Sequence, residues 1–250
     1  MSTVPSMAPT PEEPAKIGAF GRLIGVLMSP GETFADIARV PTWIAPILVL
    51  TVLSLCASFV LMQRVDWRSY LEKQLSQSSR WEQLTPEQKT QQLELTQKII
   101  PYQAYGGGLL GPVVGALIIG AIFWGCFNLF LSAGIKFKLA YCISAHALMV
   151  SLVSTPLVIL VSFLKKPGEV NPEHLLASNV GELLSTETPK WLLSLAGSLD
   201  VFSFWLMALL AIGFAAANPK KISKGAGFAV VFGVWAVYVL IKVGWVLIFS

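Results

Sequence analysis

Five long apolar runs, separated by polar segments, dominate the chain. A helix rises about 1.5 Å per residue, so roughly 20 apolar residues cross a hydrocarbon core of about 30 Å. Each run meets or nearly meets that length, which predicts an all-α, polytopic integral membrane bundle with five transmembrane helices. The predicted spans cover residues 44–62, 109–133, 143–164, 191–217 and 226–249.

The residues before the first span predict two short helices at the membrane surface. Residues 1–15 combine several prolines with an acidic pair, a composition typical of a disordered tail. In residues 16–43 apolar side chains recur at helical spacing, but neither stretch can span a bilayer, so we expect cytoplasmic interfacial helices. Ser29 and Glu32 have the spacing of a capping box, with Pro30 in the first helical position.

Two longer loops are expected on the outer side of the membrane. Residues 63–105 predict a helical loop, in which Thr85 and Gln88 have the spacing of a second capping box. Residues 165–190 predict a shorter outer loop with a small capped helix. Together with the spans, these loops form a predicted transmembrane domain over residues 44–249.

The lysines of the short loops predict which side of the membrane each loop faces. Lys136 and Lys138 lie between spans two and three, without an acid in that loop. Lys220, Lys221 and Lys224 lie between spans four and five, again without an acid. By the positive-inside rule both loops are cytoplasmic, which places the N-terminus inside and the C-terminus outside. The absence of an Asn-x-Ser/Thr site fits a bacterial inner membrane.

Two charged residues fall inside predicted spans, where a charge costs about 2.5–3.5 kcal/mol at the centre. Asp200 of span four and Lys242 of span five lie at nearly the same depth in neighbouring antiparallel helices, which predicts an ion pair. In the alternative, Lys242 extends toward the outer surface and Asp200 lies at a wet interface. A proton or ion pathway through the two residues is a third interpretation.

Two further features concern contacts between spans. Asn128 and His146 flank the loop between spans two and three, so we expect a hydrogen bond between them, with a functional histidine as the alternative. Gly107, Gly111 and Gly115 recur every four residues and would let helix backbones approach closely. This spacing predicts helix packing, within the bundle or between subunits.

Composition agrees with a membrane protein and excludes several classes of function. The chain is 54% hydrophobic and 13% charged, with a mean hydropathy of +0.67. The net charge of +4 is too scattered for a nucleic-acid surface. No motif for catalysis, nucleotide binding or metal binding is present, and the three cysteines are far apart. We therefore expect no catalytic residue, cofactor or metal, and cysteines that are free: Cys56, Cys126 and Cys142.

The order of elements resembles the bacterial branch of the Yip domain family, the Ypt/Rab-interacting-protein family, over residues 18–249. The resemblance rests on residues 29–34, 41–43, Pro46, 138–141 and Pro156. It implies five spans, a cytoplasmic N-terminus and an outside C-terminus. Eukaryotic members are trafficking proteins that engage Rab-type small GTPases and associate with each other. Some bacterial members accompany exporters, and the family supplies no catalytic residue to map onto this chain.

These features favour a non-enzymatic membrane scaffold or adaptor. Its expected partners are the lipid bilayer and other membrane proteins or a second copy of the chain, while a small GTPase is implied only by the resemblance. The predicted docking residues are Pro30, Phe34 and Ile37 on the cytoplasmic helix. The alternative is a small permease or an accessory subunit of a transporter or exporter, which rests on the polar residues within the spans.

Overall fold

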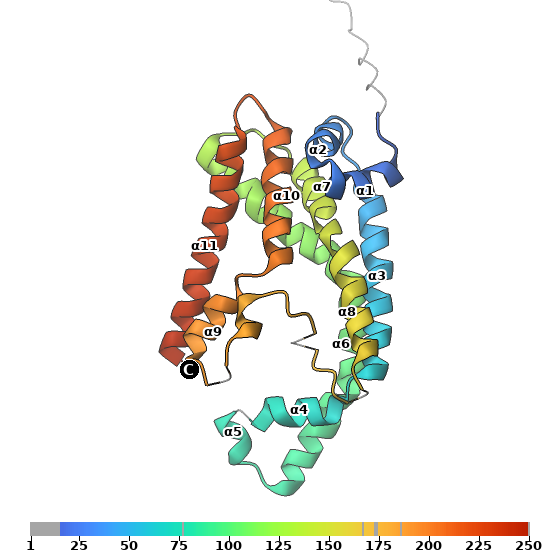
Figure 1. Ribbon diagram of the computed structural model, residues 1–250, viewed down its shortest axis with the longest axis vertical. Helices are drawn as coiled ribbons and strands as arrows, with labels where there is room; N and C mark the ends of the chain where they lie inside the picture. Colours follow the sequence, from blue (N-terminus) through green and yellow to red (C-terminus); the bar gives the residue numbers. More distant parts are fainter. Residues whose placement is uncertain (1–15, 77, 167, 173–174, 186, 250) are drawn as a thin grey trace, which may run out of the picture.

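The computed structural model describes residues 16–249 apart from 77, 167, 173, 174 and 186, and this part of the chain is built from helices (Figure 1). The tail predicted at residues 1–15 lies outside the described residues. The predicted all-α membrane fold class is confirmed. In chain order the helices are α1 (Ala19–Met28), α2 (Pro30–Arg39), α3 (Ile44–Arg64), α4 (Trp67–Ser76), α5 (Ser79–Glu82), α6 (Pro86–Leu131), α7 (Phe137–Ala147), η1 (Leu148–Val150), α8 (Ser151–Leu164), η2 (Val180–Leu183), α9 (Lys190–Gly197), α10 (Val201–Ala217) and α11 (Lys224–Phe249).

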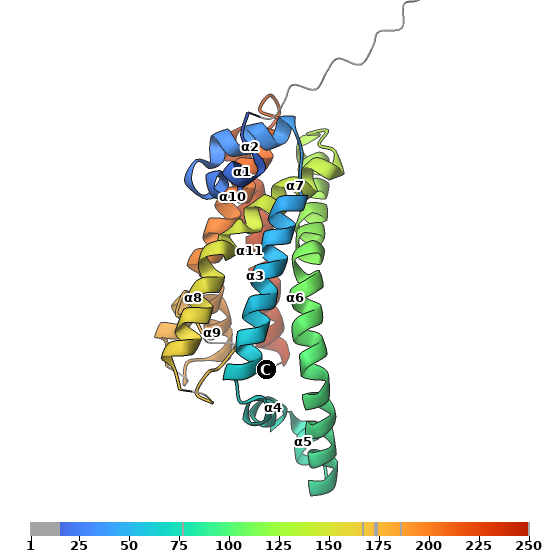
Figure 2. The same ribbon diagram turned by 90° about the vertical axis from the view of Figure 1, so that its right-hand side faces the viewer.

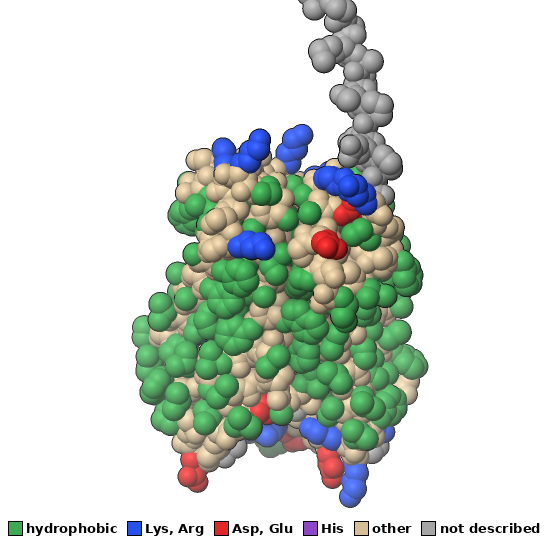
Figure 3. All heavy atoms as spheres, turned by 45° about the horizontal axis from the view of Figure 1, so that its top comes forward, with side chains coloured by type: hydrophobic (Ala, Val, Ile, Leu, Met, Phe, Trp, Pro, Cys, Tyr) green, Lys and Arg blue, Asp and Glu red, His purple; other side chains and the backbone are tan. Residues whose placement is uncertain are grey.

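A belt of exposed apolar side chains covers the middle of the molecule, and charged side chains gather toward its two ends (Figure 3). Among the described residues, four helical segments are long and apolar enough to cross a membrane: α3, α6, the run from α7 to α8, and α11. This distribution is the one that a lipid bilayer requires, because charged side chains are costly in the hydrocarbon core. Helices also satisfy their own backbone hydrogen-bonding groups there. The chain is therefore an integral membrane protein.

The fourth predicted span is divided into two helices. α9 ends at Gly197 and α10 begins at Val201, so the continuous helix predicted over 191–217 is wrong. Glycine and serine favour helix poorly and aspartate favours the residue before a helix, which explains an end and a new start at residues 197–200. The loop before α9 satisfies the freed backbone: Val201 N–H donates to the Ser178 carbonyl at 3.0 Å. α11 packs along both pieces.

Helix α6 joins the predicted outer loop and span two into one element of 46 residues. It begins at the predicted capping box, where the Thr85 side chain accepts from Gln88 N–H and the Gln88 side chain accepts from Thr85 N–H. α4 and α5 pack against its first turns in a small apolar cluster that includes Trp81 and Leu93. The Ser58 hydroxyl of α3 donates to the Ala104 carbonyl at 2.9 Å and links α3 to α6.

Small residues pack α6 against its neighbours, one position later than predicted. A Cβ would meet open space at each glycine of the predicted ridge: Gly107, Gly111 and Gly115. The buried small residues lie on the adjacent stripe: Gly108, Pro112, Ala116 and Gly120. A Cβ on Gly120 would lie 3.2 Å from Tyr141 Cα, so α7 approaches α6 closely there. The prediction that the first stripe packs within the bundle is therefore wrong.

The described chain begins and ends at opposite ends of the molecule (Figures 1 and 2). One end, which we call the N-terminal end, carries α1, α2 and the turns between α6 and α7 and between α10 and α11. The other end carries α4, α5 and the C-terminus. α1 and α2 lie across the N-terminal end and pack on α10, α7 and the start of α3.

Candidate functional site

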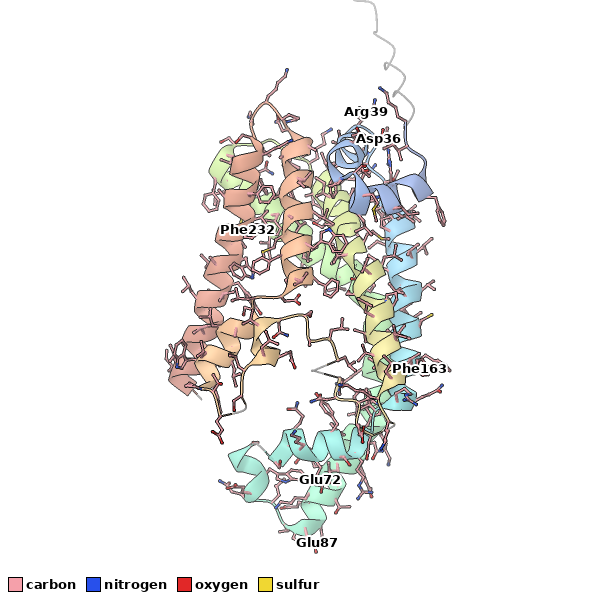
Figure 4. All side chains as sticks on the ribbon, in the orientation of Figure 1. Asp36, Arg39, Glu72, Glu87, Phe163 and Phe232 are labelled. Atoms are coloured by element: carbon pink, nitrogen blue, oxygen red, sulfur yellow. The ribbon has the colours of Figure 1, made fainter. Side chains whose placement is uncertain are left out.

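A buried ion pair joins α1 to α2 at the N-terminal end, where Figure 4 labels Asp36 and its neighbour Arg39. The side chain of Arg22 is 2% exposed and that of Asp36 is 3% exposed. Helical spacing explains both positions, because Arg22 lies four residues before the buried Val26 and Asp36 lies three residues after the buried Thr33. Each helix thus turns one charge inward, and the two charges meet.

The guanidinium group of Arg22 donates hydrogen bonds from all three of its nitrogens. Nε and Nη2 donate to Oδ2 of Asp36 at 3.0 and 2.8 Å. Nη1 donates to the carbonyl of Val40 at 2.8 Å and to the hydroxyl of Thr42 at 2.9 Å. Because Val40 and Thr42 lie between α2 and α3, one side chain holds α1, α2 and the start of the first span together.

The carboxylate of Asp36 is surrounded by donors. Oδ1 accepts from Nη2 of Arg39 and from the N–H of Lys16, and Oδ2 accepts from the N–H of Ile17 as well as from Arg22. Burial on its own would raise the pKa of Asp36, but the bonds from Arg22 and Arg39 and the two backbone donors outweigh it and lower the pKa from 3.8 to about 2. The group is therefore ionised at neutral pH.

The apolar face of α2 is part of the core. Phe34 and Ile37, two of the predicted docking residues, are both 0% exposed, and Pro30 is half-buried. A Cβ on Gly213 of α10 would lie 3.0 Å from the Phe34 ring, so α10 approaches α2 closely at a glycine. The prediction that Phe34 and Ile37 dock a partner is wrong, because α2 turns them toward α7 and α10.

Asp200 and Lys242 lie near the break between α9 and α10 but do not form the predicted ion pair. The ammonium group of Lys242 donates to the Ser194 carbonyl at 3.3 Å and to the Ser198 hydroxyl at 3.2 Å. It thereby places a positive charge at the C-terminal end of α9. The carboxylate of Asp200 accepts from Ser203 N–H at 2.8 Å and caps the N-terminal end of α10. Each charge stabilises one end of the divided helix.

Asn128 and His146 do not bond to each other. The side chain of Asn128 donates to the Ile135 carbonyl at 3.0 Å and accepts from Ile135 N–H at 2.8 Å, which fixes the turn between α6 and α7. Nδ1 of the buried His146 lies 2.8 Å from the carbonyl of Cys142, one turn earlier in the same helix. The predicted bond is wrong. Asn128 bonds to the backbone of the turn that follows α6, and His146 bonds to the backbone of its own helix, α7.

The described residues hold no group of three or more His, Cys, Asp or Glu side chains that could bind a metal ion. The cysteines are free and differ in exposure: Cys56 is exposed, Cys126 is half-buried and Cys142 is buried. Asp200 and Lys242 are instead held at helix ends, and Arg22 is held in the ion pair described above. The ion pair and its hydrogen bonds can therefore fix the N-terminal helices in place.

Sequence reasoning missed Arg22 and Asp36, although a signal for both was present. Each is a charge on the side of a short helix that also carries the apolar residues. Considered separately, each charge only interrupts the apolar face that an interfacial helix is expected to have. Considered together, two opposite charges on the inward faces of consecutive helices predict a buried pair.

The fold and this site define a polytopic, all-helical membrane protein whose N-terminal helices are built into the bundle. The model of the Yip1 domain matches residues 24–246, and the chain belongs to the Yip1 domain family. It is 26% identical over 222 residues to "Membrane protein YknW" of Bacillus subtilis (strain 168), an alignment that covers 87% of this chain and 88% of that protein. No solved structure matches the chain. The predicted membership of the Yip family is confirmed.

Proposed function

We propose that the protein is a non-enzymatic membrane scaffold, a helical platform that holds another membrane protein or a second copy of itself in the bilayer. The observation that carries this proposal is the use of polar groups. Arg22 and Asp36 join two helices, Lys242 and Asp200 stabilise helix ends, and Asn128 fixes a turn. Polar groups that are bonded in this way support a rigid frame.

The N-terminal layer supports the same function. We use this name for α1, α2 and the residues that join them to α3. Because its inward face is held by the Arg22–Asp36 pair and by buried apolar residues such as Phe34, the layer presents its outer surface in a fixed orientation. A partner would therefore meet a preformed surface, which reduces the entropy lost on binding.

The orientation follows from the lysines of the short turns. The turns at 132–136 and 218–223 share the N-terminal end, and under the positive-inside rule their lysines support a cytoplasmic N-terminal end and an outside C-terminus. The membrane would be a bacterial inner membrane. Engagement of a small GTPase rests on the family resemblance, and it would have to use the outer surface of the N-terminal layer.

The test is the size of the assembly in native membrane. The full chain is extracted with its surrounding lipid in polymer nanodiscs, without detergent, and the particle mass and composition are measured. We expect the 27.1 kDa chain together with a stoichiometric membrane partner or a second copy. The Asp36→Asn variant, which loosens the N-terminal layer, should lose that assembly. Glu32→Gln, an exposed change on the same helix, should keep it. A single chain in every preparation would contradict the scaffold.

The second candidate is an accessory subunit of a transporter or exporter, or a small permease. It rests on the divided helix, because interrupted helices with stabilised ends are typical of substrate and ion sites in transporters. Proteoliposomes test it directly: proton or solute flux that Lys242→Met abolishes and Lys242→Arg retains would favour transport over the scaffold. We expect no flux above that of empty vesicles.

A further inference from the structure

A cavity of about 410 Å³ opens at the N-terminal end of the molecule, where four segments meet. The segments are the end of α2, the start of the link to α3, the turn between α6 and α7 with the first residues of α7, and the end of α10. Each of them is the end of a helix or the turn beside it, so the cavity lies at the level where the spans finish. At that level a membrane presents its headgroups.

The cavity is basic. Three cations line it, Arg39, Lys136 and Lys138, and its described lining includes no acidic residue. Nη2 of Arg39 is bound to the Asp36 carboxylate, so the two lysines supply the net positive charge. Lys136 and Lys138 are exposed. α7 begins at Phe137, and its first backbone bonds run from Leu139 and Ala140 N–H to the Lys136 carbonyl. The N–H groups before them lie at the positive end of the helix and add a partial positive charge beside the lysines. The cavity therefore favours an anion.

The backbone around the cavity is held in place by side chains from α6 and from the end of α10. Asn128 of α6 bonds to both backbone groups of Ile135, and the Trp124 indole donates to the same carbonyl at 2.9 Å. Asn218, after α10, donates to the Ala133 carbonyl at 2.8 Å. Within this turn Gly134 has a φ of +65°, a conformation that glycine adopts without strain. A turn fixed in this way presents a preformed wall to a ligand.

The rest of the lining has a small polar part, Gly134 and Asn218, and a larger apolar part that decides the kind of anion. The apolar part consists of Ala38, Pro41, Ala133, Ile135, Leu139 and Ala217. A water molecule occupies about 30 Å³ in the liquid, so a free phosphate ion of five heavy atoms would leave most of the cavity empty. A phosphate that carries a glycerol moiety would use both the cations and the apolar wall. Basic pockets between transmembrane helices on the cytoplasmic side are typical sites for anionic headgroups.

We propose that this cavity binds the phosphate headgroup of an anionic phospholipid, such as phosphatidylglycerol, through Lys136 and Lys138. The proposal is independent of the scaffold function, because a bound lipid is compatible with either candidate function. It gives the two lysines of the turn between α6 and α7 a specific role beside their part in orientation.

The test measures lipid binding to the purified full chain in neutral detergent by native mass spectrometry. Phosphatidylglycerol is titrated, with phosphatidylcholine and inorganic phosphate in parallel. The double variant Lys136→Gln/Lys138→Gln should weaken phosphatidylglycerol binding by about 30-fold, since a cation near an anionic lipid contributes about fivefold. The matched control Lys220→Gln/Lys224→Gln removes the same charge from the same end, outside the cavity, and should change binding by less than about twofold, the effect expected of distant screened charges. Lys136→Arg/Lys138→Arg should retain binding.

Three outcomes would overturn the proposal. The first is wild-type affinity in Lys136→Gln/Lys138→Gln with an unchanged unfolding temperature. The second is an equal loss in the control variant, which would indicate a diffuse basic surface instead of a site. The third is displacement of phosphatidylglycerol by an equal concentration of inorganic phosphate, which would make a soluble anion the occupant.

Discussion

Arg22 and Asp36 illustrate, at the scale of single residues, how a charge is kept inside this protein. A buried pair is tolerated where further hydrogen bonds satisfy both groups, because the cost of desolvation is large. Arg22 has acceptors on α2 and on the link to α3, and Asp36 has two backbone donors in addition to its cations. The pair therefore fixes the positions of three segments of the chain.

Removing the charge of Asp36 should destabilise the protein strongly. In Asp36→Asn the buried Arg22 loses its counter-charge, which costs about 3–5 kcal/mol for a pair broken on one side. The measurement is the free energy of unfolding in mild detergent. Glu32→Gln, exposed on the same helix, is the control and should stay within about 0.5 kcal/mol of the wild type. A loss below about 1 kcal/mol for Asp36→Asn would mean that the pair is not buried in solution.

The same carboxylate predicts a dependence of stability on pH. The pKa of Asp36 is lowered to about 2 in the folded protein, and its ordinary value is 3.8. Its contribution is therefore fully present above about pH 5 and is lost as the pH falls from about 4 toward 2, by about 2 kcal/mol in total. The free energy of unfolding of the wild type and of Asp36→Asn, measured across this range, should converge toward acid pH. Parallel pH profiles for the two proteins would contradict this assignment.

Lys242 and Asp200 should act independently, because each stabilises a different helix end. Asp200→Ala should cost about 0.5–2 kcal/mol as a lost N-cap, and Lys242→Met a comparable amount as a lost cation at the end of α9. In the double variant the two losses should add to within about 0.5 kcal/mol. An ion pair would instead make the double variant more stable than the sum of the single losses predicts, and unfolding measurements on all four proteins would detect it.

At this scale the sequence predicts the important residues better than their partners. Asp200, Lys242 and Asn128 stand out because polar groups inside spans need a reason, and each does have a structural role. Their partners are backbone groups at helix ends and turns, and those exist only once the chain has folded. From the sequence alone, only other side chains can be proposed as partners of a polar side chain. Pairing Asp200 with Lys242 because they lie at the same depth in the membrane therefore connects the wrong groups.

At the scale of elements, helix starts are predicted where local chemistry decides them. The capping box at Thr85 forms as expected. At Ser29 the side chain makes no cap bond, and the hydroxyl of Thr33 donates to the Ser29 carbonyl instead. α2 still begins at Pro30, because proline favours the first helical position. The break at residues 198–200 was missed, since hydropathy averages over a window and does not resolve three residues.

The packing stripe of α6 shows the limit of periodicity. A period of four is correct, but a helix with glycines at both 107 and 108 offers two neighbouring stripes, and only the contacts with α3 and α7 select one. The selected stripe includes Gly108 and Gly120, while Gly111 lies on the other.

Alanine substitution should distinguish the two stripes. Gly120→Ala brings a Cβ against the backbone of Tyr141 and should lower stability by about 1–3 kcal/mol as an overpacked contact. Gly111→Ala meets open space and should leave stability unchanged or raise it by up to about 1 kcal/mol, because alanine favours helix. Thermal unfolding in lipid nanodiscs measures both. The reverse order of the two variants would contradict the observed register.

At the scale of the whole molecule, apolar run lengths are sufficient to predict an all-helical membrane protein, and they locate the ends of the bundle well. They do not predict that α1 and α2 belong to it. Short helices before a first span are usually assigned to the membrane surface, and Phe20, Ile24 and Met28 of α1 do expose apolar side chains. The opposite face of α1 and the inward face of α2 carry the contacts that build the N-terminal layer.

The central claim is that this layer is a fixed part of the bundle, and hydrogen–deuterium exchange in nanodiscs tests it most directly. Because α2 is held by the Arg22–Asp36 pair and by the contacts of Phe34 with α10, its amides should be protected to the same degree as those of α10. In Asp36→Asn, α2 should exchange faster while α10 keeps its protection. Exchange of α2 in the wild type as fast as that of a free terminal segment would contradict the account.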